Sequence, residues 1–462
     1  MRVLRFLLPL AGVGALLAAS ACQRGPAVPD LASYGALEPA VAALVTDDLR
    51  ALDEAPSDAN RWGVLAMSLD ANGLTPRAEE AYRIAATLPA SHGRWWYHVA
   101  RLRARAGDAD AALAALEQAI AKSPDYAPAR WRKGQWLFDR GDLAGAEAAF
   151  RVAANLAADD VTAATGLARV QIGSGRPAEA VTTLEALIAR VPADRYAYQV
   201  LASAYRALGR AADAEYAAAA GAAGAPEESD PWLDEMGTYR RGFAARLKDA
   251  TALGMAGRYD EAIAVLERLR DERPDDRELR TYLGGLYATA GRTAQAKPLL
   301  TALLAEQPQN FDATMNLATA HLFDGAHDDA DRLVTAALAL RPDDADATRL
   351  RGVVAWRRQQ LDDAERWLLA AAAANPRDAK ALGWVGTIRL ERARAPQALE
   401  AFRAALTRDP LLVDALVGGA SAALATGATD EARRWTARAK QLAPGHRGLG
   451  DLERRLTVKG AQ

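Results

Sequence analysis

Apolar and polar positions alternate along this chain with the period of an α-helix, and Gly and Pro interrupt the pattern at regular intervals. Between residues 93 and 126, one apolar face recurs with helical spacing over about 95–106 and again over about 110–122. Gly107 suits the left-handed conformation with which many helices end, and Pro124 stops the second helix. The pattern predicts two antiparallel helices joined by a tight turn.

The same pattern returns every 34 residues from Ala59 onward, and it makes eleven units. The eighth position of every unit is Ala or Gly, and the twentieth position is always Ala. Gly occupies the fifteenth position in nine units, with Gln359 and Ala393 as the exceptions. Larger residues such as Phe150 and Phe402 stand at the twenty-fourth position, where we expect them to fill the space left between the helices.

A 34-residue period with these small-residue columns resembles the tetratricopeptide repeat (TPR) family. The resemblance implies an all-α fold, a TPR α-solenoid in which helix-turn-helix repeats form a right-handed superhelix. It also implies that the two helices of a unit meet so closely at positions eight and twenty that only Ala or Gly fits. A larger side chain there would overpack the contact and cost roughly 1–3 kcal/mol. The resemblance is to a repeat class, which does not identify partners.

The repeats divide the chain into segments. These are a signal peptide (1–21), a tether (22–36), an N-terminal capping helix (37–58), repeats one to five (59–228), a junction (229–242), repeats six to eleven (243–446), and a C-terminal capping helix and tail (447–462). The repeat slips out of phase only at the junction. Two interpretations stay open there. One is an elongated helix that joins two arrays, and the other is a hinge or contact element that meets a partner through exposed Trp232, Tyr239, Arg240 and Arg241.

The first 22 residues have the layout of a secretory signal, because Arg2 and Arg5 precede an apolar stretch that ends in small residues. This segment resembles a bacterial lipoprotein signal, which implies that Cys22, the chain's single cysteine, carries lipid. Ala19 departs from that motif, which usually has Leu there. Ordinary cleavage before Cys22 is the alternative. Gln23, where an Asp would favour the inner membrane, points to the outer membrane.

Composition and motifs give no sign of catalysis or nucleic-acid binding. The formal net charge is −2 with 25% charged residues, so no bulk attraction to nucleic acid is present. The five histidines are scattered without metal-ligand spacing. Phosphate-binding glycine loops, nucleophile elbows and haem-attachment motifs are missing from the sequence. We therefore expect no cofactor, no metal and no enzymatic activity of the chain itself.

In TPR arrays the first helices line a concave groove, and the resemblance assigns positions two, five, six, nine, twelve and thirteen of each unit to it. The candidate binding residues are Tyr97, His98, Arg101, Trp131, Arg132, Gln135, Arg169, Gln199 and Arg206 in the N-terminal half, and Tyr282, Asn316, Arg349, Trp356 and Trp384 in the C-terminal half. Arginine pairs with carboxylates and aromatic rings offer rigid contact area, so this groove suits a peptide that carries carboxylates. The alternative is that these side chains only pack against the neighbouring repeat.

Together these features predict a non-catalytic scaffold that lipid holds to the cell envelope, at the outer membrane and facing the periplasm. It would bind protein or peptide partners in an envelope assembly. An alternative is a polysaccharide-export or glycan-binding scaffold, with Trp131, Trp356 and Trp384 as sugar platforms. A further alternative is an accessory subunit of an envelope enzyme whose activity resides in the partner.

Metabolic labelling with palmitate tests the N-terminal interpretation. Because Cys22 is the chain's single cysteine, we expect the wild-type protein to take up the label and the Cys22→Ala variant to lose it. Label that survives the substitution, or that never appears in the wild-type protein, contradicts lipidation.

Overall fold

A computed structural model describes residues 25–222, 224–226 and 228–460 of the chain. These ranges form 25 α-helices, one short 3-10 helix (η1, Leu31–Tyr34) and no strand, which confirms the predicted all-α fold. None of the helices in this part of the chain is long and apolar enough to cross a membrane. Cys22 and the predicted signal peptide lie outside the described residues.

The helices follow one another as antiparallel pairs, one pair to each 34-residue unit, after an initial helix α1 (Pro39–Glu54). The N-terminal array consists of α2 (Ala59–Ala71), α3 (Thr75–Thr87), α4 (Gly93–Arg105), α5 (Ala109–Lys122), α6 (Ala127–Asp139), α7 (Leu143–Leu156), α8 (Val161–Gly173), α9 (Pro177–Arg190), α10 (Arg195–Ala207) and α11 (Ala211–Ala220). Helix α1 packs on α2 through the fully buried Val45 and Leu52.

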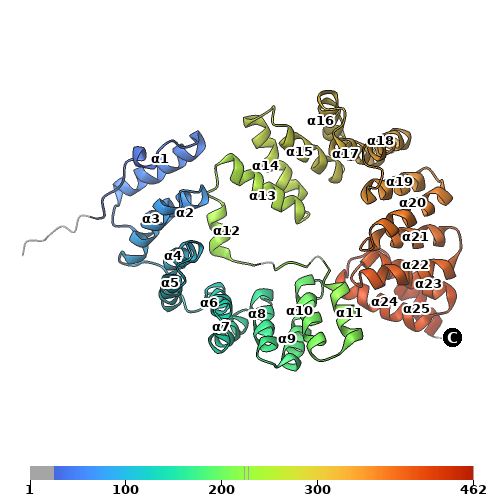
Figure 1. The fold of residues 1–462 in the computed structure, drawn as a ribbon, viewed down its shortest axis with the longest axis horizontal. Helices are drawn as coiled ribbons and strands as arrows, with labels where there is room; N and C mark the ends of the chain where they lie inside the picture. The colour runs from blue at the N-terminus through green and yellow to red at the C-terminus, as the bar shows by residue number, and fades with distance from the viewer. Residues whose placement is uncertain (1–24, 223, 227, 461–462) are drawn as a thin grey trace, which may run out of the picture.

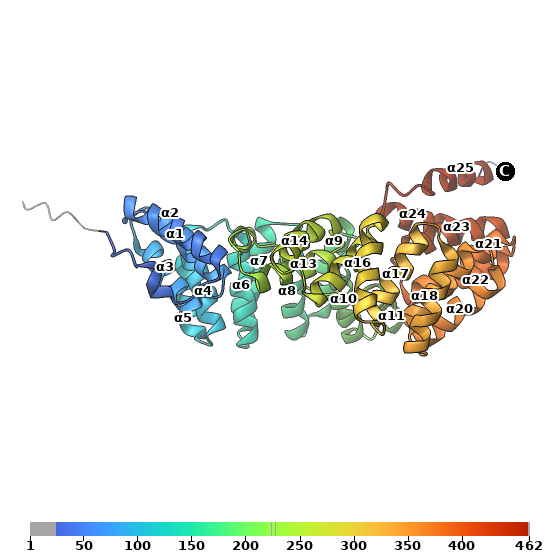
Figure 2. The ribbon, with the colours of Figure 1, turned by 90° about the horizontal axis from the view of Figure 1, so that it is seen from above.

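One short helix, α12 (Pro231–Gly237), lies between the arrays. The C-terminal array consists of α13 (Phe243–Met255), α14 (Tyr259–Glu272), α15 (Arg277–Thr289), α16 (Thr293–Glu306), α17 (Phe311–Phe323), α18 (His327–Leu340), α19 (Ala345–Arg357), α20 (Leu361–Ala374), α21 (Ala379–Glu391), α22 (Ala395–Arg408), α23 (Val413–Thr426) and α24 (Thr429–Leu442). Helix α25 (Leu449–Gly460) packs on α23 and α24 at the end of this array (Figure 2).

The two small-residue columns are the contact between the two helices of each unit. Every Ala or Gly at positions eight and twenty is buried. A Cβ added to Gly134 would lie 2.8 Å from the ring of Phe150, and one added to Gly386 would lie 2.9 Å from the ring of Phe402. Both rings belong to position twenty-four, so the expected filling of the space beside the small residues is confirmed.

Position fifteen ends the first helix of each unit in the left-handed conformation. Gly325, for example, has φ 77°. The two exceptions in the sequence have the same backbone, with φ 61° at Gln359 and 56° at Ala393. The turn geometry is therefore imposed by the repeat and not by the glycine, and these two residues adopt a conformation that costs an L-residue with a Cβ about 1–2 kcal/mol.

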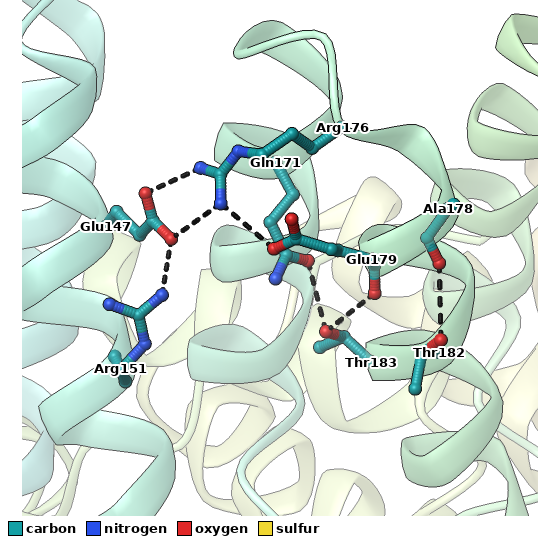
Figure 3. Close-up of polar contacts among 8 residues, drawn as sticks. All are labelled: Glu147, Arg151, Gln171, Arg176, Ala178, Glu179, Thr182 and Thr183. Atoms are coloured by element: carbon teal, nitrogen blue, oxygen red, sulfur yellow. Dashed lines mark hydrogen bonds and ion pairs between the residues drawn. The ribbon is translucent and has the colours of Figure 1, made fainter.

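Arginine–carboxylate pairs connect the second helix of one unit to the next unit. Figure 3 shows one of them: Arg176, just before α9, donates to both carboxylate oxygens of Glu147 in α7, at 2.6 and 3.1 Å, and Arg151 donates to the same group. Arg389 and Glu365 make an equivalent link at 2.8 Å. The hydrogen bonds from Arg176 lower the pKa of the Glu147 carboxyl. The pair therefore stabilises the fold above the unfolded pKa of that carboxyl and is lost as pH falls through the lowered folded value.

The two arrays form two arcs whose ends meet, so that the chain closes on itself (Figure 1). At one meeting point Arg195 in α10 donates to both oxygens of Asp409, at 2.8 and 3.1 Å, and Arg438 in α24 donates to the hydroxyl of Tyr198. At the other, the Asn72 side-chain oxygen accepts from the backbone of Arg241, at 2.8 Å, and of the next residue.

The junction is not an elongated helix that joins the arrays, and that interpretation is wrong. Within the junction only Pro231–Gly237 is helical, and residues 238–242 separate this helix, α12, from α13. Helix α11 ends at Ala220, the chain crosses the interior of the closed arrangement to α12 (Figure 1), and the described residues between them, 221–222, 224–226 and 228–230, are not helical. Gly224 passes so close to α10 that an added Cβ would lie 2.7 Å from the backbone of Arg195. Pro231 disfavours the helical conformation at the preceding residue, Asp230, whose backbone is extended with φ −140° and ψ 90°.

The left-handed residue Ala393 generates a stability prediction. We expect Ala393→Gly to raise the free energy of unfolding by about 1 kcal/mol, because glycine adopts this backbone without steric cost. Gly325→Ala is the matched control and should lower it by a similar amount, since no atom lies within 4 Å of its added Cβ. Urea denaturation followed by circular dichroism measures both, and an unchanged or lower stability of Ala393→Gly contradicts the account.

Candidate functional site

The first-helix face of repeats two and three, in the N-terminal array, is covered by the junction. Asp230, the N-cap of α12, is only 1% exposed, and its carboxylate faces the array. It accepts hydrogen bonds from the hydroxyls of Tyr97, in α4, and Tyr126, just before α6, the latter at 2.6 Å. Arg132 in α6 approaches the same carboxylate at 3.4 Å and donates to the Tyr97 hydroxyl at 2.8 Å. Three donors of the array therefore converge on one acid of the junction.

An aromatic contact continues this interface. The indole of Trp232 stacks on the ring of Tyr126, with centroids 3.4 Å apart and 13° between the planes. Tyr97 and His92 meet the same indole edge to face, at 5.4 and 5.5 Å. The Trp232 backbone N–H donates to the Tyr126 hydroxyl at 3.0 Å. The junction thus contributes one acid and one aromatic ring to a face built by α4, α6 and the residues just before them.

Charged residues of the array hold both ends of the same segment. Arg94 in α4 donates to both carboxylate oxygens of Glu235, each at 3.1 Å. Arg132 donates to Glu228 at 2.9 Å. Arg101 contacts the sulfur of Met236 at 3.3 Å. The segment 228–236, which we name the junction ligand, therefore contacts α4 and α6 along its whole length.

The protonation of this interface follows from its burial. Burial, together with the nearby Asp230 carboxylate, raises the pKa of Tyr126 far above its ordinary value, and burial likewise raises the pKa of Tyr97. Both hydroxyls therefore stay protonated, and each donates a hydrogen bond to the carboxylate. The buried side chain of Asp230 therefore has two hydroxyl donors and one guanidinium within hydrogen-bond distance.

Two of the predicted groove residues, His98 and Trp131, belong to the interior and not to the groove surface. Tyr97, His98 and Trp131 are each 0% exposed and present no free surface. His98 lies behind the groove face, stacked 4.8 Å from the ring of Tyr82, and burial lowers its pKa well below the ordinary value. Arg132 is engaged by the junction ligand, so the inward-facing positions of repeats two and three are occupied by the chain itself.

The remaining N-terminal candidates are dispersed. Arg101 pairs with the buried carboxylate of Asp70 in α2. Arg169 lies 4.9 Å over the ring of Phe138 and is partly buried, as is Gln135. Gln199 and Arg206 in α10 are exposed. The structure does not gather these residues into one site.

The first-helix face of the C-terminal array, in contrast, is open. Two pockets of 740 and 930 Å³ share Thr289 and Met315, so they form one continuous groove along α13, α15, α17, α19 and α21. The five C-terminal candidates all line it: Tyr282, Asn316, Arg349, Trp356 and Trp384. We name this surface the C-terminal groove.

The polar groups of the C-terminal groove differ in their availability. Arg349 pairs with Asp346 at 2.6 Å and with Asp378 at 3.2 Å, so its charge is already compensated. The Asn316 side chain lies over Gly285, where an added Cβ would come within 2.7 Å of its amide nitrogen. Within the described residues this amide makes no hydrogen bond, which leaves both a donor and an acceptor for a ligand.

Sequence reasoning missed the residues that occupy the N-terminal face. Asp230 and Glu235 lie outside the repeats, and Tyr126 stands at the end of a unit, where no groove position is expected. One signal was present: Asp-Pro-Trp at 230–232 is a concentrated polar and aromatic motif in the one stretch that breaks the repeat.

As for metals, the described residues contain no group of three or more His, Cys, Asp or Glu that could hold an ion.

Comparison with known proteins agrees with this architecture. Sequence profiles of the family described as Tetratricopeptide repeat match residues 63–124, 99–161, 137–204, 253–297, 287–354 and 386–447. The chain has no match among curated proteins.

Solved structures of TPR proteins resemble parts of the chain. A thermophilic TPR protein of Thermus thermophilus is 25% identical over 40% of this chain and 100% of its own, with a TM-score of 0.37. YrrB, described as a TPR protein with an unusual peptide-binding site, is 17% identical over 42% of this chain and 97% of its own, with a TM-score of 0.32. Yeast Tom70 is 14% identical over 89% of this chain and 96% of its own, with a TM-score of 0.40. Because the family's profiles together match well over half of the sequence, this chain belongs to the tetratricopeptide repeat family.

Proposed function

We propose that this protein is a non-catalytic scaffold that binds a protein or peptide partner in its C-terminal groove, as part of a cell-envelope assembly. Lipid on Cys22 would hold it to the membrane, with the repeats facing the periplasm. TPR proteins are generally scaffolds that bind proteins or peptides. The envelope location rests on the resemblance of residues 1–22 to a lipoprotein signal.

The observation that carries the binding proposal is the contrast between the two arrays. The inward face of repeats two and three is covered by the junction ligand, whereas the C-terminal groove is open along five first helices. Its lining combines aromatic faces, such as Trp356, with an unengaged amide at Asn316. Such a surface suits an extended segment, because amides bind main-chain groups and aromatic side chains give contact area at low entropic cost.

Photocrosslinking in intact cells tests this proposal. A photoreactive amino acid at position 316 or 356 should give discrete adducts with an envelope protein, because both positions line the groove. Position 367 is the matched control: Trp367 is also partly buried and belongs to the same repeat, but it lies on the second helix, α20, outside both pockets.

We expect adducts at 316 and 356 and few at 367. Equal labelling at all three positions, or no adduct at the groove positions, contradicts a partner in the C-terminal groove. Adducts with cytoplasmic proteins alone would contradict the envelope location and leave the groove assignment standing.

Glycan binding is a second candidate, favoured by Trp356 and Trp384 at one end of the groove. Trp131 drops out as a sugar platform because it is fully buried. Retention of a soluble polysaccharide that Trp384→Ala abolishes and Trp367→Ala does not would favour this candidate over a peptide partner.

A further inference from the structure

The covered face of the N-terminal array has the features of a binding site, independent of the C-terminal groove. We propose that the first-helix face of repeats two and three binds acidic protein segments that carry an aromatic residue two positions after an Asp, and that the junction ligand occupies this site in cis. A partner segment of the same chemistry would displace it.

The array supplies a preformed site for one carboxylate. The hydroxyls of Tyr97 and Tyr126 and the guanidinium of Arg132 come from two successive repeats and converge on Asp230. Arg132 is itself held in place, 4.5 Å over the ring of Trp131 and hydrogen-bonded to Tyr97. The donors therefore belong to the rigid solenoid, and the acid belongs to the inserted segment.

Beside this carboxylate site lies a site for one aromatic ring. Tyr126, Tyr97 and His92 surround the indole of Trp232 on its face and edges. The same hydroxyl of Tyr126 that donates to Asp230 also accepts the backbone N–H of Trp232. Tyr126 thus contacts the acid, the aromatic ring and the backbone N–H of the aromatic residue. These contacts together require the aromatic residue to stand two positions after the acid.

Charge complementarity extends the match beyond these two residues. The sequence of the junction ligand, ESDPWLDEM, contains four acidic residues and no basic one. Arg132 and Arg94 meet Glu228 and Glu235, near its two ends. The array contributes cations and the segment contributes anions, which is the pattern of a ligand in its site.

The junction ligand reaches this site as a tethered segment and not as part of either array. The described residues between α11 and α12 are not helical, and α12 has only seven residues. A tether of this length gives the bound segment a local concentration of about millimolar order, so a free peptide competes poorly until the cis contact is weakened.

A labelled peptide with the sequence of residues 226–240 tests the proposal on the whole chain. In the Asp230→Asn, Trp232→Ala protein the cis contact is weakened, and we expect the peptide to bind at least about tenfold more tightly than to the wild-type protein, by fluorescence anisotropy. Adding Arg132→Ala to this protein should remove the gain. The exposed acid Asp234 provides the matched control, and Asp234→Asn should behave like wild type.

A peptide that itself carries Asp230→Asn and Trp232→Ala should not bind. Equal binding of that peptide, or no binding of the native peptide to a protein with wild-type helical circular dichroism, overturns the proposal. If the double variant does not fold, the isosteric Asp230→Asn variant replaces it under the same criteria. Asn316→Ala should leave peptide binding unchanged, so failure here is distinguishable from failure of the C-terminal groove.

Discussion

The close approach of two helices at positions eight and twenty is the contact on which the whole solenoid depends. Ala or Gly at both positions lets the backbones meet, and a larger residue at position twenty-four, such as Phe150 against Gly134, fills the space beside them. Because each unit repeats this contact, every first helix presents its remaining positions to the inner face of the arc. The groove is therefore a consequence of packing. Its chemistry is set by the residues at the variable positions of the first helices.

The two arrays use the same inner face differently. In repeats two and three the face is filled by the junction ligand through a buried carboxylate, a stacked indole and two arginine pairs. In the C-terminal array the corresponding face stays open. The phase slip between the arrays is thus a structural element in its own right. Residues 228–236 fill the first-helix face of repeats two and three, and the backbone of 239–242, bound to Asn72, positions the second array.

The fold could be predicted from the sequence because its determinants are local and repeated. The small residues, the turn residues and the residues they contact all lie within one 34-residue unit. Even the exceptions at position fifteen, Gln359 and Ala393, have the same left-handed backbone as the glycines. The occupied face could not be predicted, because Tyr97 and Asp230 are 133 positions apart and no periodicity relates them. Their position within the repeat unit places Tyr97 and Arg132 on the inner face, but it carries no information about what covers that face. The five residues of the C-terminal groove could be predicted, because their position within the repeat unit alone places them on the open face.

Amide hydrogen exchange across residues 230–237 in the whole protein shows whether the junction ligand occupies the inner face of repeats two and three. A seven-residue helix without tertiary contacts exchanges rapidly, because isolated helices of this length are marginal in water. If the junction ligand is held on the first-helix face of repeats two and three, the amides of 233–237 exchange slowly, at rates near those of α4. Rapid exchange of these amides, while α4 stays protected, would contradict the account.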